Sequence, residues 1–343
     1  MKNKKILIIL SGAGILFIVI FIILYTTVFG LNITSLKNNQ FLYIATGSSY
    51  EQVLDTLKSK LLIKDINIFN WLAKKKNYPD AIKPGRYLVG SSISYNGLIN
   101  LLRSGRQWPV KVTFSNVRTL NDIAGKFGKQ LEPDSTKIIN FFTDESNYSK
   151  DGFRKESIIS IFIPNTYELY WNTDVGSLYV RMLKEYKLFW NDMRLSKAKE
   201  KNLTPLEVSI LASIVDNEAL KRDEKPKIAA VYINRIKRGI PLQSDPTILF
   251  AMNDFKITRV LKKYLLVDSP YNTYRHSGFP PGPIGCATIE GIDAVLDAEN
   301  NDYLYFAAKA DFSGYHNFSR TLSEHNKYAL SYQRELNKRK IFR

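Results

Sequence analysis

The chain has 343 residues, of which 45% are hydrophobic and 13% aromatic, so it can bury a sizeable core and is not intrinsically disordered. Its formal net charge of +17 is compatible with nucleic acid, an anionic membrane surface or an acidic polymer as partner. The basic residues are scattered, and no zinc-ligand spacing, Walker loop, dinucleotide fingerprint or RNA-recognition signature is present, which argues against a nucleic-acid partner. The single cysteine, Cys286, excludes an intramolecular disulfide, and three histidines are too sparse to predict a metal site.

The N-terminus is predicted to hold a membrane anchor. Residues 1–5 include three lysines, and residues 6–29 form an uncharged apolar run, long enough for a bilayer core that needs about 20 helical residues. A cleavable signal peptide has a shorter apolar core and a small-residue cleavage site, and no such site follows this run. Because lysines precede the span, the positive-inside rule places residues 1–5 in the cytoplasm. The chain after about Leu31 is then expected outside the cytoplasmic membrane, in a single-pass topology.

Residues 40–105 have the pattern of a small unit with the order strand, helix, helix, strand. Ser49 and Gln52 have the spacing of a capping box, and Gly105 is placed to end the last helix. The unit contains no acid/base constellation, which is typical of a binding or spacer module. The elements expected from apolar periodicity and turn residues are strands at 42–45 and 86–89 and helices that begin at Ser49, Asp65 and Ser94.

Residues 106–155 are predicted to form a second small α/β segment and a linker. Residues 110–114 alternate like a strand, and Thr119 opens a helix. The polar stretch 133–156 surrounds one short apolar helix and is the candidate domain boundary. The remaining residues, 156–343, are predicted to form one mixed α/β domain.

The segment 161–171 is unusually aromatic and has two interpretations. It can be a core strand followed by a loop that turns at Pro164. It can also be a wall on which sugar rings stack, because aromatic faces such as that of Tyr167 pack against pyranose rings while Glu168 bonds hydroxyls. The pattern favours the core strand and leaves the sugar-binding wall open.

The helix predicted over 205–220 carries a candidate catalytic group. Thr204 and Glu207 have the spacing of a capping box at the start of this helix, and a proline fits its first turn. On a helical wheel, Glu218 falls in the apolar arc that contains Leu211 and Val215. Burial in such an arc would raise the pKa of a carboxyl group toward about 6 to 7, where a general acid is useful. An equally open interpretation is a glutamate at a helix end that pairs with a following Lys or Arg.

Three later segments combine polar residues with rigid turns. The polar stretch 242–247 is predicted as a loop, in which Asp245 can serve simply as a turn cap. Residues 271–274 and the Pro/Gly-rich stretch 278–285 suit either a surface connection or a fixed binding loop. His316 falls at a polar loop position, where a lone histidine is more often a hydrogen-bonding residue than a metal ligand.

With these segments, the chain resembles the YceG-like family of endolytic murein transglycosylases. Several separate motifs occur in the family's order, and the close match covers about residues 162–328. The family's catalytic Glu aligns with Glu218, its preceding acidic residue appears as Asp216, and Asn217 stands where a Lys is common. The segments that carry the resemblance are 211–219, 230–235, 242–247, 271–274, 278–284, 303–306, 316–318 and 325–326.

The resemblance implies an α+β fold: an N-terminal transmembrane helix, a LysM-like βααβ module at 40–105 and a mixed α/β YceG-like catalytic domain at 156–343. It implies cleavage of the N-acetylmuramoyl–N-acetylglucosamine β-1,4 bond within peptidoglycan glycan strands, leaving a 1,6-anhydromuramoyl end and terminating or trimming nascent strands. No cofactor is implied, and peptidoglycan synthases are candidate partners. Glu218 is implied as catalytic acid and base, and the implied substrate-binding residues are Tyr167, Glu168, Gln243, Ser244, Asp245, Thr247, Tyr271, Asn272, Tyr274 and His316.

Two other classes of function remain open from the sequence. A noncatalytic peptidoglycan-binding scaffold would keep the anchor and the LysM-like unit yet tolerate loss of Glu218. A hydrolytic muramidase generally needs two carboxylates, and Asp245 is the only rival to Glu218 that the sequence offers. The mass of the product separates these classes, because an anhydro product is one water lighter than a hydrolytic one.

Overall fold

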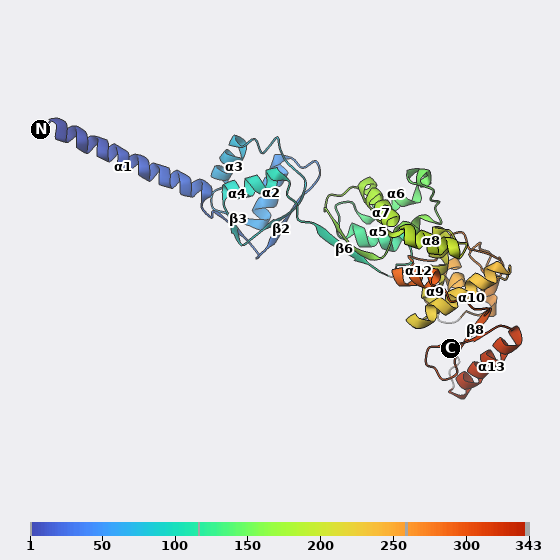
Figure 1. Ribbon diagram of the computed structural model, residues 1–343. Coiled ribbons are helices and arrows are strands. Elements are labelled where there is room, and N and C mark those ends of the chain that lie inside the picture. The colour runs from blue at the N-terminus through green and yellow to red at the C-terminus, as the bar shows by residue number, and fades with distance from the viewer. Residues whose placement is uncertain (1, 116, 258–259, 340–343) are drawn as a thin grey trace. The chain divides into compact units, whose positions relative to one another are not determined.

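The computed structural model describes residues 2–115, 117–257 and 260–339 (Figure 1). The chain divides into two compact units, which are described one at a time. The first unit comprises Met1–Lys111, Gln130–Glu132 and Glu168–Asp174. The second comprises Val112–Lys129, Pro133–Tyr167 and Val175–Arg343.

Helix α1 (Lys2–Phe29) opens the first unit, and in the described part of the chain it is the one helix that is long and apolar enough to cross a membrane. The apolar run predicted from the sequence is thus a continuous helix, and its large apolar side chains from Leu10 to Tyr25 are exposed. The Asn32 amide caps the end of this helix, with bonds of 2.7 Å to the carbonyl of Thr27 and 3.0 Å to that of Gly30. Ile33 is already fully buried, so the helix joins the core of the first unit through a short, hydrogen-bonded link.

The first unit is built on two small antiparallel sheets, one of order β3-β1-β5 and one in which β2 pairs with β4. The predicted order of strand, helix, helix, strand is confirmed as β2-α2-α3-β4, with the short strand β3 between the helices. The predicted capping box at Ser49 and the left-handed Gly105 after the last helix are also confirmed. The elements are β1 (Ile33–Ser35), β2 (Gln40–Ile44), α2 (Tyr50–Lys60), β3 (Leu61–Ile63), α3 (Ile66–Lys75), β4 (Gly85–Val89), β5 (Ser92–Ile93) and α4 (Tyr95–Ser104).

The second unit is mostly helical, with two-stranded sheets β6-β7 and β8-β9. The stretch 133–156, expected as a linker, lies within this unit. Its elements, with the ends of β6 and β7 reaching into the first unit, are β6 (Val110–Phe114), α5 (Leu120–Gly128), α6 (Ser135–Thr143), β7 (Asn165–Leu169), α7 (Val175–Phe189), α8 (Asp192–Glu200), α9 (Pro205–Glu218), α10 (Lys225–Lys237), α11 (Asp245–Ala251), α12 (Ile289–Leu296), β8 (Tyr305–Ala308), β9 (His316–Ser319) and α13 (Leu322–Lys338).

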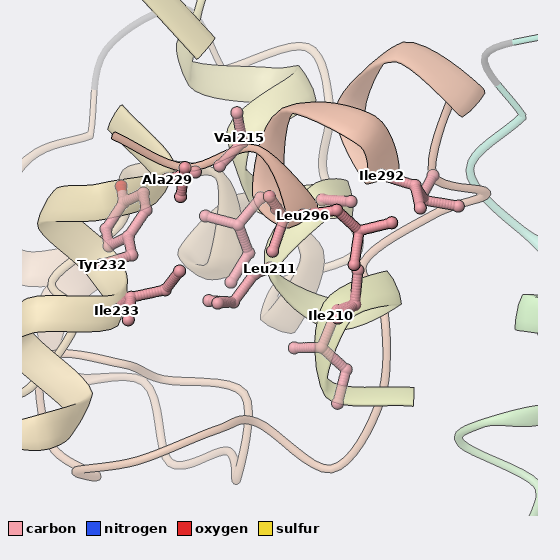
Figure 2. Close-up of a cluster of buried hydrophobic side chains, with 14 of the residues drawn as sticks. Ile210, Leu211, Val215, Ala229, Tyr232, Ile233, Ile292 and Leu296 are labelled. Atoms are coloured by element: carbon pink, nitrogen blue, oxygen red, sulfur yellow. The ribbon is translucent and has the colours of Figure 1, made fainter. Parts of the chain in front are cut away.

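The core of the second unit is packed around α9. This helix is buried along most of its length, because its apolar residues contact both α10 and α12 rather than one neighbour (Figure 2). Burial on two sides explains why the apolar arc of α9 extends far enough to enclose a carboxyl group at its last residue. The members of this cluster that Figure 2 labels are Ile210, Leu211, Val215, Ala229, Tyr232, Ile233, Ile292 and Leu296.

Asp216 fastens the end of α9 to the start of α12. Its buried carboxylate accepts bonds from the backbone N–H (2.7 Å) and the hydroxyl (2.8 Å) of Thr288, the residue that caps α12. Lys225, the first residue of α10, donates to the same carboxylate at 2.9 Å. Gly291 leaves the room that this carboxylate needs, since a Cβ atom there would lie 2.4 Å from an Asp216 oxygen. The Asp216 carboxylate therefore joins α9, α10 and α12 two residues before Glu218.

Two segments differ from the sequence expectation. The polar stretch 242–247 is only partly a loop, because Asp245 is the first residue of helix α11 and Pro246 occupies its first turn. His316 lies in strand β9, where it pairs with Ala308 of β8, and not in a loop. In both segments the polar side chains lack the apolar periodicity from which a helix or a strand is predicted.

Candidate active site

Glu218 is the last residue of α9, where the sequence fixes the helix at both ends. The Thr204 hydroxyl accepts from the Glu207 backbone N–H at 3.2 Å, and the Glu207 carboxylate accepts from the Thr204 backbone N–H at 2.7 Å. This is the predicted capping box. The helix stops at Ala219, whose backbone N–H closes the last turn on Val215. The Glu218 side chain therefore leaves the end of a rigid, buried helix.

Two hydroxyl groups hold one oxygen of the Glu218 carboxyl group. The Ser244 hydroxyl donates to Oε1 at 2.7 Å, and the Tyr232 hydroxyl donates to the same atom at 3.0 Å. Among the described residues, Oε2 has no recorded hydrogen-bond donor. One oxygen is thus fixed by the protein, and the other is available to a bound molecule.

Burial raises the pKa of Glu218 above its ordinary value. The bonds from Ser244 and Tyr232 act in the opposite direction and limit the rise, while the nearby negative charge of Asp245 adds to it. The Tyr232 pKa is raised well above its ordinary value by burial and by Glu218, so this hydroxyl remains a donor at neutral pH. A carboxyl group with a raised pKa can hold a proton near neutrality and release it to a substrate.

Glu218 lines a polar pocket of about 330 Å³, called here the Glu218 pocket. Its wall carries the charged side chains of Arg235 and Asp245. The Tyr274 hydroxyl donates to Asp245 at 2.6 Å. The Glu218 pocket is lined by Glu218, Tyr232, Arg235, Leu242, Gln243, Asp245, Tyr274, Phe306 and His325.

Arg235 shapes the loop on one side of the Glu218 pocket. Its buried guanidinium donates to the backbone carbonyls of Leu242 (2.8 Å) and Leu304 (2.6 Å), which ties the loop after α10 to the start of β8. Gln243 has a φ of 53°, an unfavourable value for a residue with a Cβ atom. Its backbone N–H donates to the carbonyl of Thr273 at 3.0 Å. The loop is thus held in a strained conformation that carries Gln243 to the pocket wall.

Four of the ten predicted substrate-binding residues gather at Glu218. Gln243, Asp245 and Tyr274 line the Glu218 pocket, and Ser244 bonds Glu218 directly while being fully buried. Ser244 is therefore placed to hold the carboxyl group rather than to contact a ligand.

Thr247 and Asn272 are also fully buried, and their polar groups are bonded within the protein. The Thr247 hydroxyl donates to the Ser244 carbonyl at 2.6 Å. The Asn272 amide donates to the carbonyls of Leu265 (2.9 Å) and Val267 (2.8 Å). Both side chains fix the loops that carry Ser244 and Tyr274.

Neither Tyr167 nor Glu168 is among the residues that line the Glu218 pocket. Tyr167 is buried, stacks on Phe114 with ring centroids 5.6 Å apart, and donates its hydroxyl to the carbonyl of Ile163. Glu168 belongs to the first unit and lies 3.3 Å from the Lys111 ammonium. The two neighbouring residues have different surroundings because β7 sends successive side chains to opposite faces.

Tyr271 and His316 also lie outside the lining of the Glu218 pocket. Tyr271 packs on Phe250, with ring centroids 4.7 Å apart, and lines a second pocket. The His316 backbone N–H donates to one oxygen of the Glu224 carboxylate at 2.9 Å, and the His316 Nδ1 lies 2.9 Å from the other oxygen. Its ring stands edge-on to Phe306, which does line the Glu218 pocket, so His316 borders the pocket through that ring.

Tyr232, Arg235 and His325 are pocket residues that sequence reasoning did not assign to the site. The first two lie on α10 among apolar residues, within the segment 230–235, which carries the resemblance but gave neither residue a role in the site. The available signal was a hydroxyl and a guanidinium embedded in an apolar helix face, since such polar ends need partners when buried. Over the described ranges, no group of three or more His, Cys, Asp or Glu has a metal-binding arrangement.

Comparisons with known proteins agree with this architecture. The model of the YceG-like family matches residues 42–330. An endolytic murein transglycosylase of Bacillus subtilis (strain 168) is 30% identical over 305 residues, covering 84% of this chain and 83% of that protein. A protein of the same name from Streptococcus pneumoniae (strain ATCC BAA-255 / R6) is also 30% identical, and the matched region spans about half (53%) of its length.

A solved structure also supports the relationship to YceG-like proteins. The crystal structure of a yceG-like protein from Listeria monocytogenes aligns with a TM-score of 0.56 at 26% identity, covering 84% of this chain and 98% of that chain. The family match extends over most of the sequence, including α9 and the loops around Glu218. The chain therefore belongs to the YceG-like family.

Proposed function

We propose that this protein is a membrane-anchored endolytic murein transglycosylase that cleaves the N-acetylmuramoyl–N-acetylglucosamine β-1,4 bond within peptidoglycan strands and leaves a 1,6-anhydromuramoyl end. The observation that carries the proposal is the single carboxyl group at the end of α9, whose pKa is raised by burial and whose Oε2 is left for a ligand. Relatives named endolytic murein transglycosylase, of which the Bacillus subtilis protein matches along most of its length, support the same reaction.

The first step uses Glu218 as a general acid. Its Oε2 proton passes to the glycosidic oxygen as the bond from that oxygen to the muramoyl C1 breaks, which releases the N-acetylglucosamine end as an alcohol. Positive charge develops on the sugar ring at C1. The carboxylate formed on Glu218 lies beside this charge and stabilises it.

The second step uses the same group as a general base. The C6 hydroxyl of the muramoyl residue attacks its own C1 while the Glu218 carboxylate takes the hydroxyl proton. The product is a 1,6-anhydro ring, the carboxylic acid is restored, and no water is consumed. One carboxyl group that gains and loses a proton is sufficient, which fits a pocket where Glu218 has the raised pKa.

The other groups of the Glu218 pocket position the reactants in this proposal. Ser244 and Tyr232 hold Oε1, so that the proton is carried on Oε2. Gln243 and Tyr274 are placed to bond the glycan, and Asp245 is held by Tyr274. Thr247 and Asn272 act only through the loops that they fix.

The first unit serves attachment and positioning. Helix α1 is proposed as a single-pass anchor with the body of the protein outside the cytoplasmic membrane. The β2-α2-α3-β4 unit is proposed as a LysM-like module that holds glycan strands, since it has that element order. Trimming or terminating nascent strands beside peptidoglycan synthases would suit an enzyme held at the membrane.

The mass of the products tests this function against its two rivals. Purified murein glycan is digested with the detergent-solubilised protein, and the fragments are measured by mass spectrometry. We expect internal cleavage that yields fragments one water lighter than hydrolytic ones. Reducing ends would indicate a muramidase that uses Asp245 as its second carboxylate, and no cleavage would indicate a scaffold.

A further inference from the structure

A second pocket in the same unit has a lining unlike that of the Glu218 pocket. It has a volume of about 410 Å³ and is called here the α5 pocket, because Arg118, Thr119, Leu120 and Asn121 at the start of α5 line it. Its apolar wall includes Ile159, Phe250 and Tyr271. A pocket with an apolar wall and a few charged groups is typical of a binding site.

The charges of the α5 pocket come from three side chains: Arg118, Lys155 and Glu156. All three residues are exposed, and no ion pair is recorded for any of them in the described part of the chain. The guanidinium of Arg118 stacks on Phe255 at 4.7 Å from the ring centroid, which restrains its position. Two cations face one anion, so the α5 pocket favours a ligand whose carboxylates outnumber its amines.

The α5 pocket and the Glu218 pocket share two wall elements. Helix α11 begins with Asp245 at the Glu218 pocket and carries Phe250 at the α5 pocket. Five residues at about 1.5 Å each put these Cα atoms about 7.5 Å apart along the helix. The loop 271–274 likewise sends Tyr274 to one pocket and Tyr271 to the other.

We propose that the α5 pocket binds a peptide branch of the murein strand while the glycan occupies the Glu218 pocket. A murein peptide branch carries several carboxylates, a free amine where it is not cross-linked, and small alkyl side chains. Arg118 and Lys155 bind its carboxylates, Glu156 faces the amine, and Phe250 and Tyr271 contact the alkyl groups. This inference rests on the proposed function, since it assigns the branch of that same substrate.

The consequence is a preference for strands that keep their peptides. Binding energy from a branch remote from the reacting bond can hold the sugar in register with Glu218 and raise kcat/KM. The loss of a charge-assisted contact to one carboxylate reduces binding by about tenfold. The preference is therefore expected to be about tenfold or more.

The test compares two substrates and two matched double variants of the full-length protein. The substrates are murein glycan with its peptides and the same glycan after an amidase has removed them. The test variant is Arg118→Ala with Lys155→Ala. The control is Arg154→Ala with Lys126→Ala, which removes the same charges from exposed residues of the second unit that do not line the α5 pocket.

We expect the native protein and the control to prefer the peptide-bearing glycan by about tenfold, and the test variant to lose that preference while cleaving bare glycan at the native rate. Free peptide released by the amidase should bind a Glu218→Gln protein, as measured by calorimetry, and about tenfold more weakly when Arg118 and Lys155 are also replaced. Equal turnover of both substrates by the native protein, or peptide binding unaffected by the double replacement, overturns the inference. No turnover of either substrate by the native protein would instead count against the proposed function.

Discussion

The two oxygens of the Glu218 carboxyl group have different surroundings, and this difference gives the residue its chemistry. Oε1 accepts two hydrogen bonds, which favour the ionised form, while burial and the charge of Asp245 favour the protonated form. The balance leaves the pKa raised. A group in this state can donate a proton and then recover one within the same catalytic cycle.

Substitutions at Ser244 and Asp245 should move the pH profile in opposite directions. The alkaline limb of kcat/KM reports the ionisation of Glu218 in the free enzyme. Ser244→Ala removes a bond that lowers the Glu218 pKa, so the limb should move to higher pH. Asp245→Asn removes a charge that raises this pKa, so the limb should move to lower pH. The measurement is anhydro-end release across a pH series for both variants.

The turnover that each variant retains provides the control for this experiment. Ser244→Ala should reduce turnover by about 2- to 10-fold at its new optimum, since one hydrogen bond contributes about 0.5–1.5 kcal/mol. Asp245→Asn should remain active, because Asp245 is assigned to positioning. Shifts of the limb in the same direction would contradict the electrostatic account of Glu218.

The sequence placed Glu218 in the apolar arc of a helix, but it did not assign Tyr232 or Ser244 to hold the carboxyl group. A carboxyl group inside an apolar helical arc is a pattern of one element, which periodicity reports directly. Tyr232 and Arg235 look like ordinary helix positions until the fold brings α10 against α9. Thr247 and Asn272 are polar residues of binding-type motifs, yet their side chains point inward to backbone carbonyls. Which way a loop side chain points depends on tertiary contacts that no local pattern contains.

At the scale of elements, the Glu218 pocket depends on how α9, α10 and α12 meet. Asp216 lies two residues before Glu218 and bonds both other helices through Thr288 and Lys225. Moving Asp216 would therefore move the end of α9. The close approach of Gly291 to this carboxylate makes the packing testable without changing any charged residue.

Gly291→Ala should destabilise the protein, whereas Gly125→Ala should not. A Cβ atom at residue 291 would lie 2.4 Å from one oxygen of the Asp216 carboxylate, a group that three hydrogen bonds hold in place, so we expect a loss of about 1–3 kcal/mol. Gly125 lies within α5, and a Cβ atom there meets nothing within 4 Å, so alanine should add about 0.5–1 kcal/mol. Denaturant unfolding of both variants measures the difference. Equal stability of the two would show that Asp216 is free to move.

Element boundaries were predictable where caps are local. The capping boxes at Ser49 and Thr204, the helix start at Thr119 and the left-handed Gly105 were all predicted, because each depends on residues close together in the sequence. Helix α11 was missed because Gln243 and Ser244, which precede it, and Asp245, its first residue, resemble a turn. Gln243 and Asp245 line the Glu218 pocket, which accounts for their polarity. The backbone N–H groups of Gln243 and Ser244 donate to Thr273 in the loop 271–274, and these bonds stabilise the start of the helix.

At the scale of the whole molecule, the described residues include one helix able to cross a membrane, a small unit of sheets and helices, and a larger unit that contains Glu218. The 6–29 apolar run predicted the long helix, and the pattern at 40–105 predicted the strands and helices of the small unit. The sequence placed the boundary between the units in the polar stretch 133–156, whereas the larger unit includes that stretch. Polar composition alone did not mark the boundary, because its helix α6 buries Ile138 and Phe142.

The proposed topology predicts that the body of the protein is exposed outside the cytoplasmic membrane. Protease added to intact spheroplasts should digest everything beyond about Leu31 and leave a cytoplasmic control protein untouched. The physical reason is the charge asymmetry, with lysines before the span and no second span in the described chain. Survival of the body together with the control would reverse the orientation.

The central claim is that one carboxyl group, Glu218, carries both proton transfers, and release of anhydromuramoyl ends by Glu218→Gln tests it most directly. Glutamine keeps the oxygen that accepts from Ser244 and Tyr232 but cannot exchange a proton, so release should fall by about 10²- to 10⁴-fold. Glycan binding should persist, and the unfolding temperature at pH 8 should be no lower than native, because the buried ionised form is removed. A folded Glu218→Gln protein that keeps more than about a tenth of native release would contradict the account.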